Sequence, residues 1–233
     1  MRMVERILAI SDIHGQNTKL LSLLEKANYN SASDLLIICG DIIDRGTENL
    51  ATIATCKNLI KQGAIVLMGN HEQMAIQSIE DMLKNFYHKE ITDNIFYWIQ
   101  HNGGNNFYHD LCTLNIEELK EVKNFLEKLP QYFTLDPFIF SHGGANIDKP
   151  LCENDVNELL WMNPAFPFSP GYKDKIMIFG HVPTFRLTNI KNKKNTKIWY
   201  DKIHKDKIGI DCGSIMGGQL AAIELPGYRE FYV

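Results

Sequence analysis

Apolar and polar positions alternate regularly through the first 85 residues of the chain. Short apolar runs bounded by polar residues predict buried strands, and apolar residues that recur at helical spacing predict helices. The expected strands are 6–11, 35–39 and 64–68, and the expected helices are 17–27, 47–62 and 72–83. The buried face of the first helix is expected to carry Leu20, Leu21, Leu23 and Leu24. Strands that alternate with helices imply right-handed crossovers and a parallel sheet.

The pattern changes in the rest of the chain. Residues 85–130 are mostly helical in pattern and rich in aromatic side chains, which predicts a cap-like insertion. Two apolar runs, 137–140 and 176–179, predict further strands. Short strands joined by turns, expected to be antiparallel, follow at 197–200, 207–211, 219–225 and 229–233. With no repeat or linker, the simplest interpretation is a single α/β domain, residues 1–233, with mixed sheets.

Composition and charge exclude several classes of protein. Hydrophobic residues make up 45% of the chain and charged residues 22%, which is typical of a globular protein with a sizeable core. The net charge of −4 and the lack of a long basic tract argue against a nucleic-acid polymer as partner. The basic string 191–194 is interpreted as a solvated hairpin tip.

Cysteine usage and hydropathy bear on location. The five cysteines are scattered, and none forms a CxxC pair, which argues against a disulfide framework and favours a reducing compartment. No apolar run is long enough for a signal peptide core or a membrane span, so we expect a cytoplasmic protein with no membrane partner. The sequence favours no oligomeric state.

A small polar cluster with a glycine follows each of five predicted strands. Ligands of open α/β sheets bind outside the carboxyl ends of the strands, so these clusters are expected to converge on one rim. The clusters are Ser11-Asp12-Ile13-His14-Gly15, Gly40-Asp41-Ile42-Ile43-Asp44-Arg45-Gly46, Gly69-Asn70-His71-Glu72, Ser141-His142-Gly143-Gly144 and Gly180-His181-Val182-Pro183.

The residue types in these clusters indicate a metal centre. Asp, Asn and His without a thiolate suit Mn, Fe or Zn better than they suit a structural zinc site. A carboxylate between two ions can bridge them, and two ions stabilise both oxygens of an in-line displacement at phosphorus. Taken singly, each residue has an ordinary interpretation as a helix cap, a turn residue, a surface ion pair or a loop histidine. Five strand ends in series favour the metal interpretation.

These motifs resemble those of the calcineurin-like metallophosphoesterases, and within them the small bacterial serine/threonine phosphatases of the phosphoprotein phosphatase branch. The similar patterns are D-x-H-G, G-D-x-x-D-R-G, G-N-H-E, H-G-G and G-H, in order along nearly the whole chain. Later similar stretches are Asn102-Gly103-Gly104, Trp161, Asp211-Cys212-Gly213 and Gly217-Gly218. The resemblance implies two packed mixed β-sheets flanked by helices, a four-layer α/β/β/α sandwich.

The resemblance also implies a set of metal ligands. Asp12 and His14 would hold the first ion, and Asp41 would bridge to the second. The remaining ligands of the second ion would be Asn70, His142 and His181. The cofactors would be two divalent ions, with Mn expected and Fe or Zn as alternatives. A hydroxide that bridges the ions would attack phosphorus directly, without a phosphoenzyme.

Three further residues would act on the substrate. The resemblance makes His71 the general acid, held by Asp44, and makes Arg45 the ligand of the phosphoryl oxygens. A histidine beside a carboxylate is suited to deliver a proton near neutral pH. A guanidinium can clamp a phosphate with two parallel hydrogen bonds.

Two positions depart from the protein phosphatase pattern, which carries arginine at both. Met68 precedes Gly69-Asn70, and Asn163 follows shortly after Trp161. Loss of a charged hydrogen bond to phosphate costs about 1.5–3 kcal/mol, and phosphomonoesters should suffer more because they carry more charge. Arg186 could compensate, although a surface position is the plainer interpretation.

Three functions follow from this comparison. The first is a serine/threonine protein phosphatase acting on a phosphorylated protein. The second is a symmetrical dinucleoside tetraphosphate (Ap4A) hydrolase acting on a nucleotide, since these enzymes also lack the first arginine. Adenine could then stack on aromatic residues that are otherwise a subdomain core, namely Phe96, Tyr97, Trp98, Phe107 and Tyr108. The third is a phosphoprotein-binding module without activity, which the complete ligand set disfavours.

Overall fold

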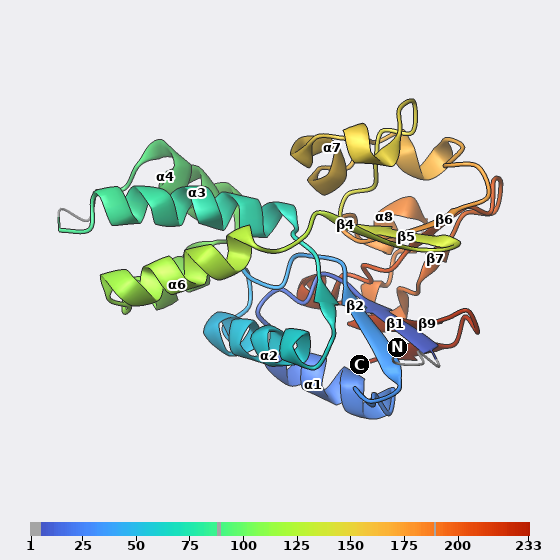
Figure 1. The fold of residues 1–233 in the computed structure, drawn as a ribbon, viewed down its shortest axis with the longest axis horizontal. Helices are drawn as coiled ribbons and strands as arrows, with labels where there is room; N and C mark the ends of the chain where they lie inside the picture. Colours follow the sequence, from blue (N-terminus) through green and yellow to red (C-terminus); the bar gives the residue numbers. More distant parts are fainter. Residues whose placement is uncertain (1–5, 88–89, 189) are drawn as a thin grey trace.

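Two five-stranded mixed sheets form the centre of the molecule (Figure 1). The structure is a computed structural model that describes residues 6–87, 90–188 and 190–233. The first sheet has the strand order β10-β9-β1-β2-β3, and the second has the order β4-β5-β6-β8-β7. The strands are β1 (Arg6–Ile10), β2 (Asp34–Ile38), β3 (Ile65–Val66), β4 (Tyr132–Leu135), β5 (Phe138–Ser141), β6 (Ile176–Phe179), β7 (Trp199–Tyr200), β8 (Lys207–Gly209), β9 (Ala221–Leu225) and β10 (Glu230–Tyr232).

Helices flank the two sheets. Figure 1 shows α1 and α2 along the first sheet, α7 over the second, and α3, α4 and α6 together to one side. The α-helices are α1 (Asn17–Lys26), α2 (Asn49–Lys61), α3 (Asn70–Lys84), α4 (Asp93–Asn102), α5 (Asn105–Leu111), α6 (Ile116–Glu127), α7 (Val156–Leu160) and α8 (Thr184–Leu187). Short 3₁₀ helices are Leu151–Glu153, Phe166–Phe168, Lys193–Asn195 and Ser214–Met216.

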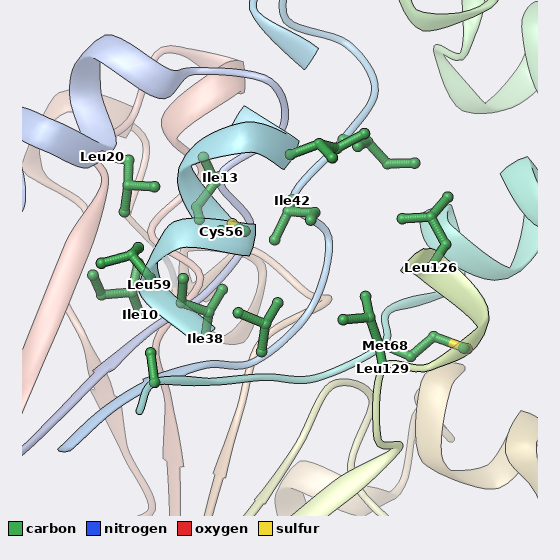
Figure 2. Close-up of a cluster of buried hydrophobic side chains, with 14 of the residues drawn as sticks. Ile10, Ile13, Leu20, Ile38, Ile42, Cys56, Leu59, Met68, Leu126 and Leu129 are labelled. Carbon is green, nitrogen blue, oxygen red and sulfur yellow. The ribbon is translucent and has the colours of Figure 1, made fainter. Parts of the chain in front are cut away.

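The alternating direction of side chains along the strands explains how the sheets and helices form layers. Successive side chains of a strand point to opposite faces, so Ile7 and Ala9 of β1 pack between the sheets while Leu8 and Ile10 pack under the helices. Figure 2 shows Ile10 with Ile38 of β2 in the cluster that α1 and α2 cover. A third cluster joins the outer face of the second sheet to α7. The result is the expected four-layer α/β/β/α sandwich.

Several sequence expectations need correction. Leu21 is 50% exposed, because the buried stripe of α1 is narrower than expected and consists of Leu20, Leu23 and Leu24. The late strands pair antiparallel as expected, β7 with β8 and β9 with β10, but β8 also pairs parallel with β6, because the chain crosses over through α8 after β6. The basic string 191–194 is exposed as expected, but its last two residues begin the 3₁₀ helix Lys193–Asn195 between α8 and β7, so it is not a hairpin tip.

Other expectations concern the organisation of the chain. Helices α4, α5 and α6 occupy the described part of 85–130, and residues 88–89 of that segment lie outside the described residues. The division into one domain with an insertion stays a prediction. In the part of the chain that the structure describes, no helix is long and apolar enough to cross a bilayer. The five cysteines are free thiols, and Cys39, Cys56 and Cys212 are buried.

Candidate active site

The nine candidate residues follow strands of both sheets. Clusters from β1, β2 and β3 of the first sheet meet clusters from β5 and β6 of the second, so the five clusters converge as expected, at an edge that both sheets share. The two sheets pack face to face, and the site lies where the carboxyl ends of these strands come together. Seven of the nine side chains are buried, namely Asp12, His14, Asp41, Asp44, Asn70, His71 and His142, while Arg45 and His181 are half-buried.

The two carboxylate oxygens of Asp41 face two different groups of donor atoms. Oδ2 lies 3.7 Å from Nε2 of His14, which is in turn 3.8 Å from Oδ1 of Asp12. We call Asp12, His14 and Asp41 the first donor cluster. Oδ1 of Asp41 lies 3.3 Å from Nε2 of His142. One carboxylate therefore faces two groups of donor atoms, which is the arrangement that a bridging ligand requires.

The second donor cluster contains Asp41, Asn70, His142 and His181. Oδ1 of Asn70 lies 2.9 Å from Nε2 of His142 and 2.9 Å from Nδ1 of His181. The two imidazole nitrogens are themselves 3.2 Å apart. Oxygen and nitrogen donors that converge in this way fit a divalent cation of borderline softness.

Hydrogen bonds to backbone carbonyls orient two of the imidazoles. Nδ1 of His14 lies 3.0 Å from the carbonyl oxygen of Ile43, and Nδ1 of His142 lies 2.8 Å from that of Cys39. Each Nδ1 therefore donates a proton to a carbonyl, which directs Nε2 of the same ring at the donor clusters. Such partners fix the tautomer of metal-binding histidines.

Burial and mutual charge displace the pKa values of these groups. Burial lowers the pKa of His181 to about 3 and that of His14 well below its usual value, so both rings are neutral and offer a lone pair. Burial alone would raise the pKa of Asp41, but the charges of His142 and His71 outweigh it and hold that pKa well below its usual value. Asp41 is therefore ionised, as a bridging carboxylate requires.

Metal affinity is expected to rise with pH because of His142. Burial would lower its pKa, but the negative charge of Asp41 raises it to about 10, so the metal-free ring is protonated near neutral pH. An ion that binds Nε2 must displace this proton, so manganese affinity should rise by up to about tenfold per pH unit between about pH 6.5 and pH 8.5. Calorimetry in buffers of different ionisation enthalpy measures the affinity and counts the protons released. Affinity that does not change with pH would contradict this prediction.

Asp44 and His71 form a buried pair beside the donor clusters. Nδ1 of His71 donates to Oδ2 of Asp44 at 2.7 Å, which leaves Nε2 facing the site. Burial alone would lower the pKa of His71, but the charges of Asp41 and Asp44 outweigh it and raise that pKa. The same Oδ2 accepts a hydrogen bond of 2.6 Å from Nε1 of Trp98 on α4. The sequence predicted Trp98 as a core aromatic or as a surface for adenine stacking, and did not predict this hydrogen bond.

The Arg45 guanidinium lies between His14 of the first donor cluster and His71 of the buried pair. Its Nη1 lies 2.7 Å from Nε2 of His14, and its Nη2 lies 2.9 Å from Nε2 of His71. Residues at the junction of α4 and α5 hold its backbone. The Arg45 N–H donates to the Gly103 carbonyl at 2.8 Å, and the Arg45 carbonyl accepts from the Asn106 side chain at 3.0 Å. A guanidinium held between His14 and His71 is placed to bind a phosphoryl group.

Six of the nine candidate residues have a left-handed backbone conformation, with φ between 48° and 72°. They are Asp12, His14, Asp41, Asp44, Arg45 and His181. Asp and His tolerate positive φ better than most residues, but arginine gains nothing from it. Strained backbone of this kind clusters where function requires a fixed side-chain direction.

Two further buried carboxylates, Glu72 and Asp211, lie near the site, and the sequence motifs predicted a role for neither. Glu72 accepts from the N–H groups of Asp41, Ile42 and Gly69 at 2.7 to 3.0 Å, and so ties the end of β2 to the start of α3. Its place in the G-N-H-E motif was the available signal. Asp211 lies in the Asp211-Cys212-Gly213 stretch, and burial together with the charge of Asp12 raises its pKa well above the usual value.

The structure also shows the surroundings of Met68 and Asn163, which replace arginines of the protein phosphatase pattern, and of Arg186. Met68 is buried and packs with Leu126 and Leu129 in the apolar cluster of Figure 2. In this chain position 68 is therefore a core contact. Asn163 is exposed and accepts from the Ala165 N–H. Arg186 is exposed on α8, in agreement with the surface interpretation.

The aromatic residues of 96–108 do not form one surface. Trp98 and Phe107 are buried and pack edge to face, with ring centroids 6.0 Å apart. Phe96 and Tyr97 are 55% and 57% exposed. The core interpretation therefore holds for the first pair, and Trp98 and Phe107 are not available to stack on a base.

Comparisons with known proteins agree with this geometry. The family model for calcineurin-like phosphoesterases matches residues 5–209. The chain is 27% identical to serine/threonine-protein phosphatase 2 of Salmonella typhimurium, over 94% of this chain and 92% of the relative. It is 23% identical to a symmetrical bis(5'-nucleosyl)-tetraphosphatase of Dechloromonas aromatica, over 97% and 94%.

A solved structure shows the same fold. The crystal structure of a candidate diadenosine tetraphosphatase superposes with a TM-score of 0.69 at 18% identity, over 98% of this chain and 92% of that one. The family model covers most of the chain, and the relatives that match along its whole length are phosphate-cleaving enzymes. The chain therefore belongs to the calcineurin-like phosphoesterase family and is a hydrolase of the metal-dependent phosphatase type.

Proposed function

We propose that this protein is a serine/threonine protein phosphatase that hydrolyses phosphomonoesters with two divalent ions, manganese being the expected metal. The observation that carries the proposal is Asp41, whose two oxygens face separate donor clusters 3.7 and 3.3 Å away. The first cluster would hold one ion and the second cluster the other. When bound, two such ions lower the pKa of water and stabilise negative charge at phosphorus.

The remaining residues act on the substrate itself. Arg45 holds the phosphoryl oxygens with its two guanidinium nitrogens, between His14 and His71. His71 donates the proton on Nε2 to the leaving oxygen, and Asp44 keeps the ring oriented through Nδ1. The buried position of this pair excludes water that would otherwise compete for the Asp44 carboxylate.

The acid pair favours a monoester over an anhydride. A serine or threonine alkoxide is a poor leaving group that needs a proton, whereas a nucleoside diphosphate is a good one that needs little help. His71 and Asp44 are buried, hydrogen-bonded to each other at 2.7 Å and held by Trp98. Burial of such a pair costs desolvation free energy, which a reaction that needs no general acid would not require. The Salmonella relative supports the same choice.

Symmetrical hydrolysis of dinucleoside tetraphosphates is the alternative. Asn163 stands where the protein phosphatase pattern has an arginine, and the Dechloromonas relative matches along its whole length. The burial of Trp98 and Phe107 removes part of the proposed stacking surface, and the core position of Met68 weakens the argument from its missing arginine. A binding module without activity does not fit membership of this enzyme family. The cytoplasmic location stays a prediction.

A competition assay is expected to show preferential release of phosphate from a phosphothreonine peptide. Manganese-loaded protein receives the peptide and diadenosine tetraphosphate together, and chromatography resolves the products. Preference for the peptide is expected because the acid pair accelerates loss of an alcohol more than loss of ADP. The Asp41→Asn variant is the control for contaminating activity. Preferential release of ADP would instead establish the anhydride function.

A further inference from the structure

We propose that Trp98 is a positioning residue of the acid pair, and that its indole N–H fixes the Asp44 carboxylate so that His71 presents its proton to the leaving group. The inference rests on the proposed function, because it takes His71 as the general acid. The proposal gives α4, which carries Trp98, a role in catalysis in addition to covering the core.

The first argument is the arrangement of donors around Asp44. Its side chain is fully buried, and Oδ2 accepts from Nδ1 of His71 at 2.7 Å and from Nε1 of Trp98 at 2.6 Å. Among the described residues, Oδ1 of Asp44 has no hydrogen-bond partner. Without the indole, the His71 contact alone would set the rotation of the carboxylate, and Oδ1 would compete with Oδ2 for it.

The second argument is that glycines fix the indole. A Cβ atom on Gly104 would lie 2.3 Å from Cε2 of Trp98, so this ring position requires a glycine there. Gly103 has φ 76°, and a Cβ atom on it would lie 2.8 Å from Cγ of Arg45. The two glycines therefore allow the segment to contact both Trp98 and Arg45. A segment that only covered the core would need no such close approach to two site residues.

The third argument is the chemistry of the side chain. Phe107 packs edge to face against Trp98, and this contact would suit any aromatic ring. The bond to Asp44 is different, because it requires an N–H in the ring plane and it is made to a buried carboxylate. Hydrogen bonds to charged groups are stronger than neutral ones, and their loss leaves the charge without a partner.

The test is the Trp98→Phe variant, which keeps an aromatic ring and removes the N–H. Turnover is measured on a phosphothreonine peptide, whose leaving group needs a proton, and on p-nitrophenyl phosphate, whose leaving group does not. We expect turnover of the peptide to fall about ten- to a hundredfold, which is less than the 10²–10⁴-fold loss of a missing general acid, and turnover of p-nitrophenyl phosphate to change little. Manganese content should equal that of the unaltered protein.

Two further variants calibrate the result. Trp199→Phe makes the same exchange in β7, where the indole packs against Phe168 and Phe179, and should leave both activities unchanged. His71→Asn sets the loss expected when the acid is absent. If His71→Asn affects both substrates equally, the proposed acid is wrong. If His71→Asn discriminates and Trp98→Phe lowers both activities equally, only the positioning role is overturned.

A spectroscopic measurement covers the case in which Trp98→Phe does not fold. The three tryptophans give three indole N–H signals in a ¹⁵N spectrum, and Trp161→Phe and Trp199→Phe assign them. The Trp98 signal should be shifted downfield, protected from exchange, and moved by Asp44→Asn. An unshifted signal in rapid exchange with water would overturn the proposal.

Discussion

Replacing Asp41 with asparagine is expected to abolish phosphatase activity and to empty both metal positions. The substitution removes the charge that faces both donor clusters, at 3.7 Å from His14 and 3.3 Å from His142. Metal ions contribute several kcal/mol of charge stabilisation, so we expect turnover to fall by about 10³-fold or more. Elemental analysis after gel filtration should show loss of both equivalents of manganese.

Asp174→Asn is a matched control for this variant. Asp174 has φ 56°, close to the 54° of Asp41, but it is exposed on a loop. The same exchange in the same backbone conformation should change neither metal content nor turnover. An Asp41→Asn protein that keeps one full equivalent of manganese would show that the carboxylate does not bridge.

Replacing His71 with asparagine is expected to lower turnover by about 10²–10⁴-fold while leaving metal content unchanged. The reason is that Nδ1 of His71 is bound to Asp44, and under the proposed function its Nε2 would deliver a proton rather than hold an ion. Turnover of the phosphothreonine peptide and bound manganese are measured on the same preparation. His109→Asn, on the exposed face of α5, is the control.

The metal measurement distinguishes two roles for His71. Its donor atoms lie within 4.8 Å of those of His14 and Asp41, so the geometry alone also permits it to be a metal ligand. Loss of manganese from His71→Asn would assign it to the first cluster and leave the reaction without the proposed acid. Retained metal with reduced turnover is the result that the hydrogen bond to Asp44 predicts.

The residues of the site could be predicted because their pattern is local. Each cluster follows its strand within a few residues, and polar side chains with a glycine at the end of an apolar run are visible without any tertiary information. The structure brings all nine candidates together, and their roles stay a proposal. The early strands and helices were predictable for the same reason, apart from small shifts such as the end of β1 at Ile10.

What could not be predicted depends on contacts distant in sequence. The hydrogen bond from Trp98 to Asp44 joins positions 54 residues apart, and nothing in the pattern around an apolar aromatic marks it. The parallel pairing of β8 with β6 follows from the crossover, which short alternating runs do not encode. The G-N-H-E motif marks Glu72 as notable, but the motif does not show that its carboxylate accepts from the turn after β2.

The division of the donors between the two sheets has a consequence for the order in which the protein is made. The first cluster needs only residues up to Asp41, and Asn70 is synthesised soon afterwards. His142 and His181 follow β5 and β6, after the ribosome has passed the middle of the chain. If the proposed division of the donors is right, the donors for one ion are all synthesised long before those for the second. On the same assignment, activity requires the second sheet to have packed against the first, so a chain becomes active only when the whole sandwich has formed.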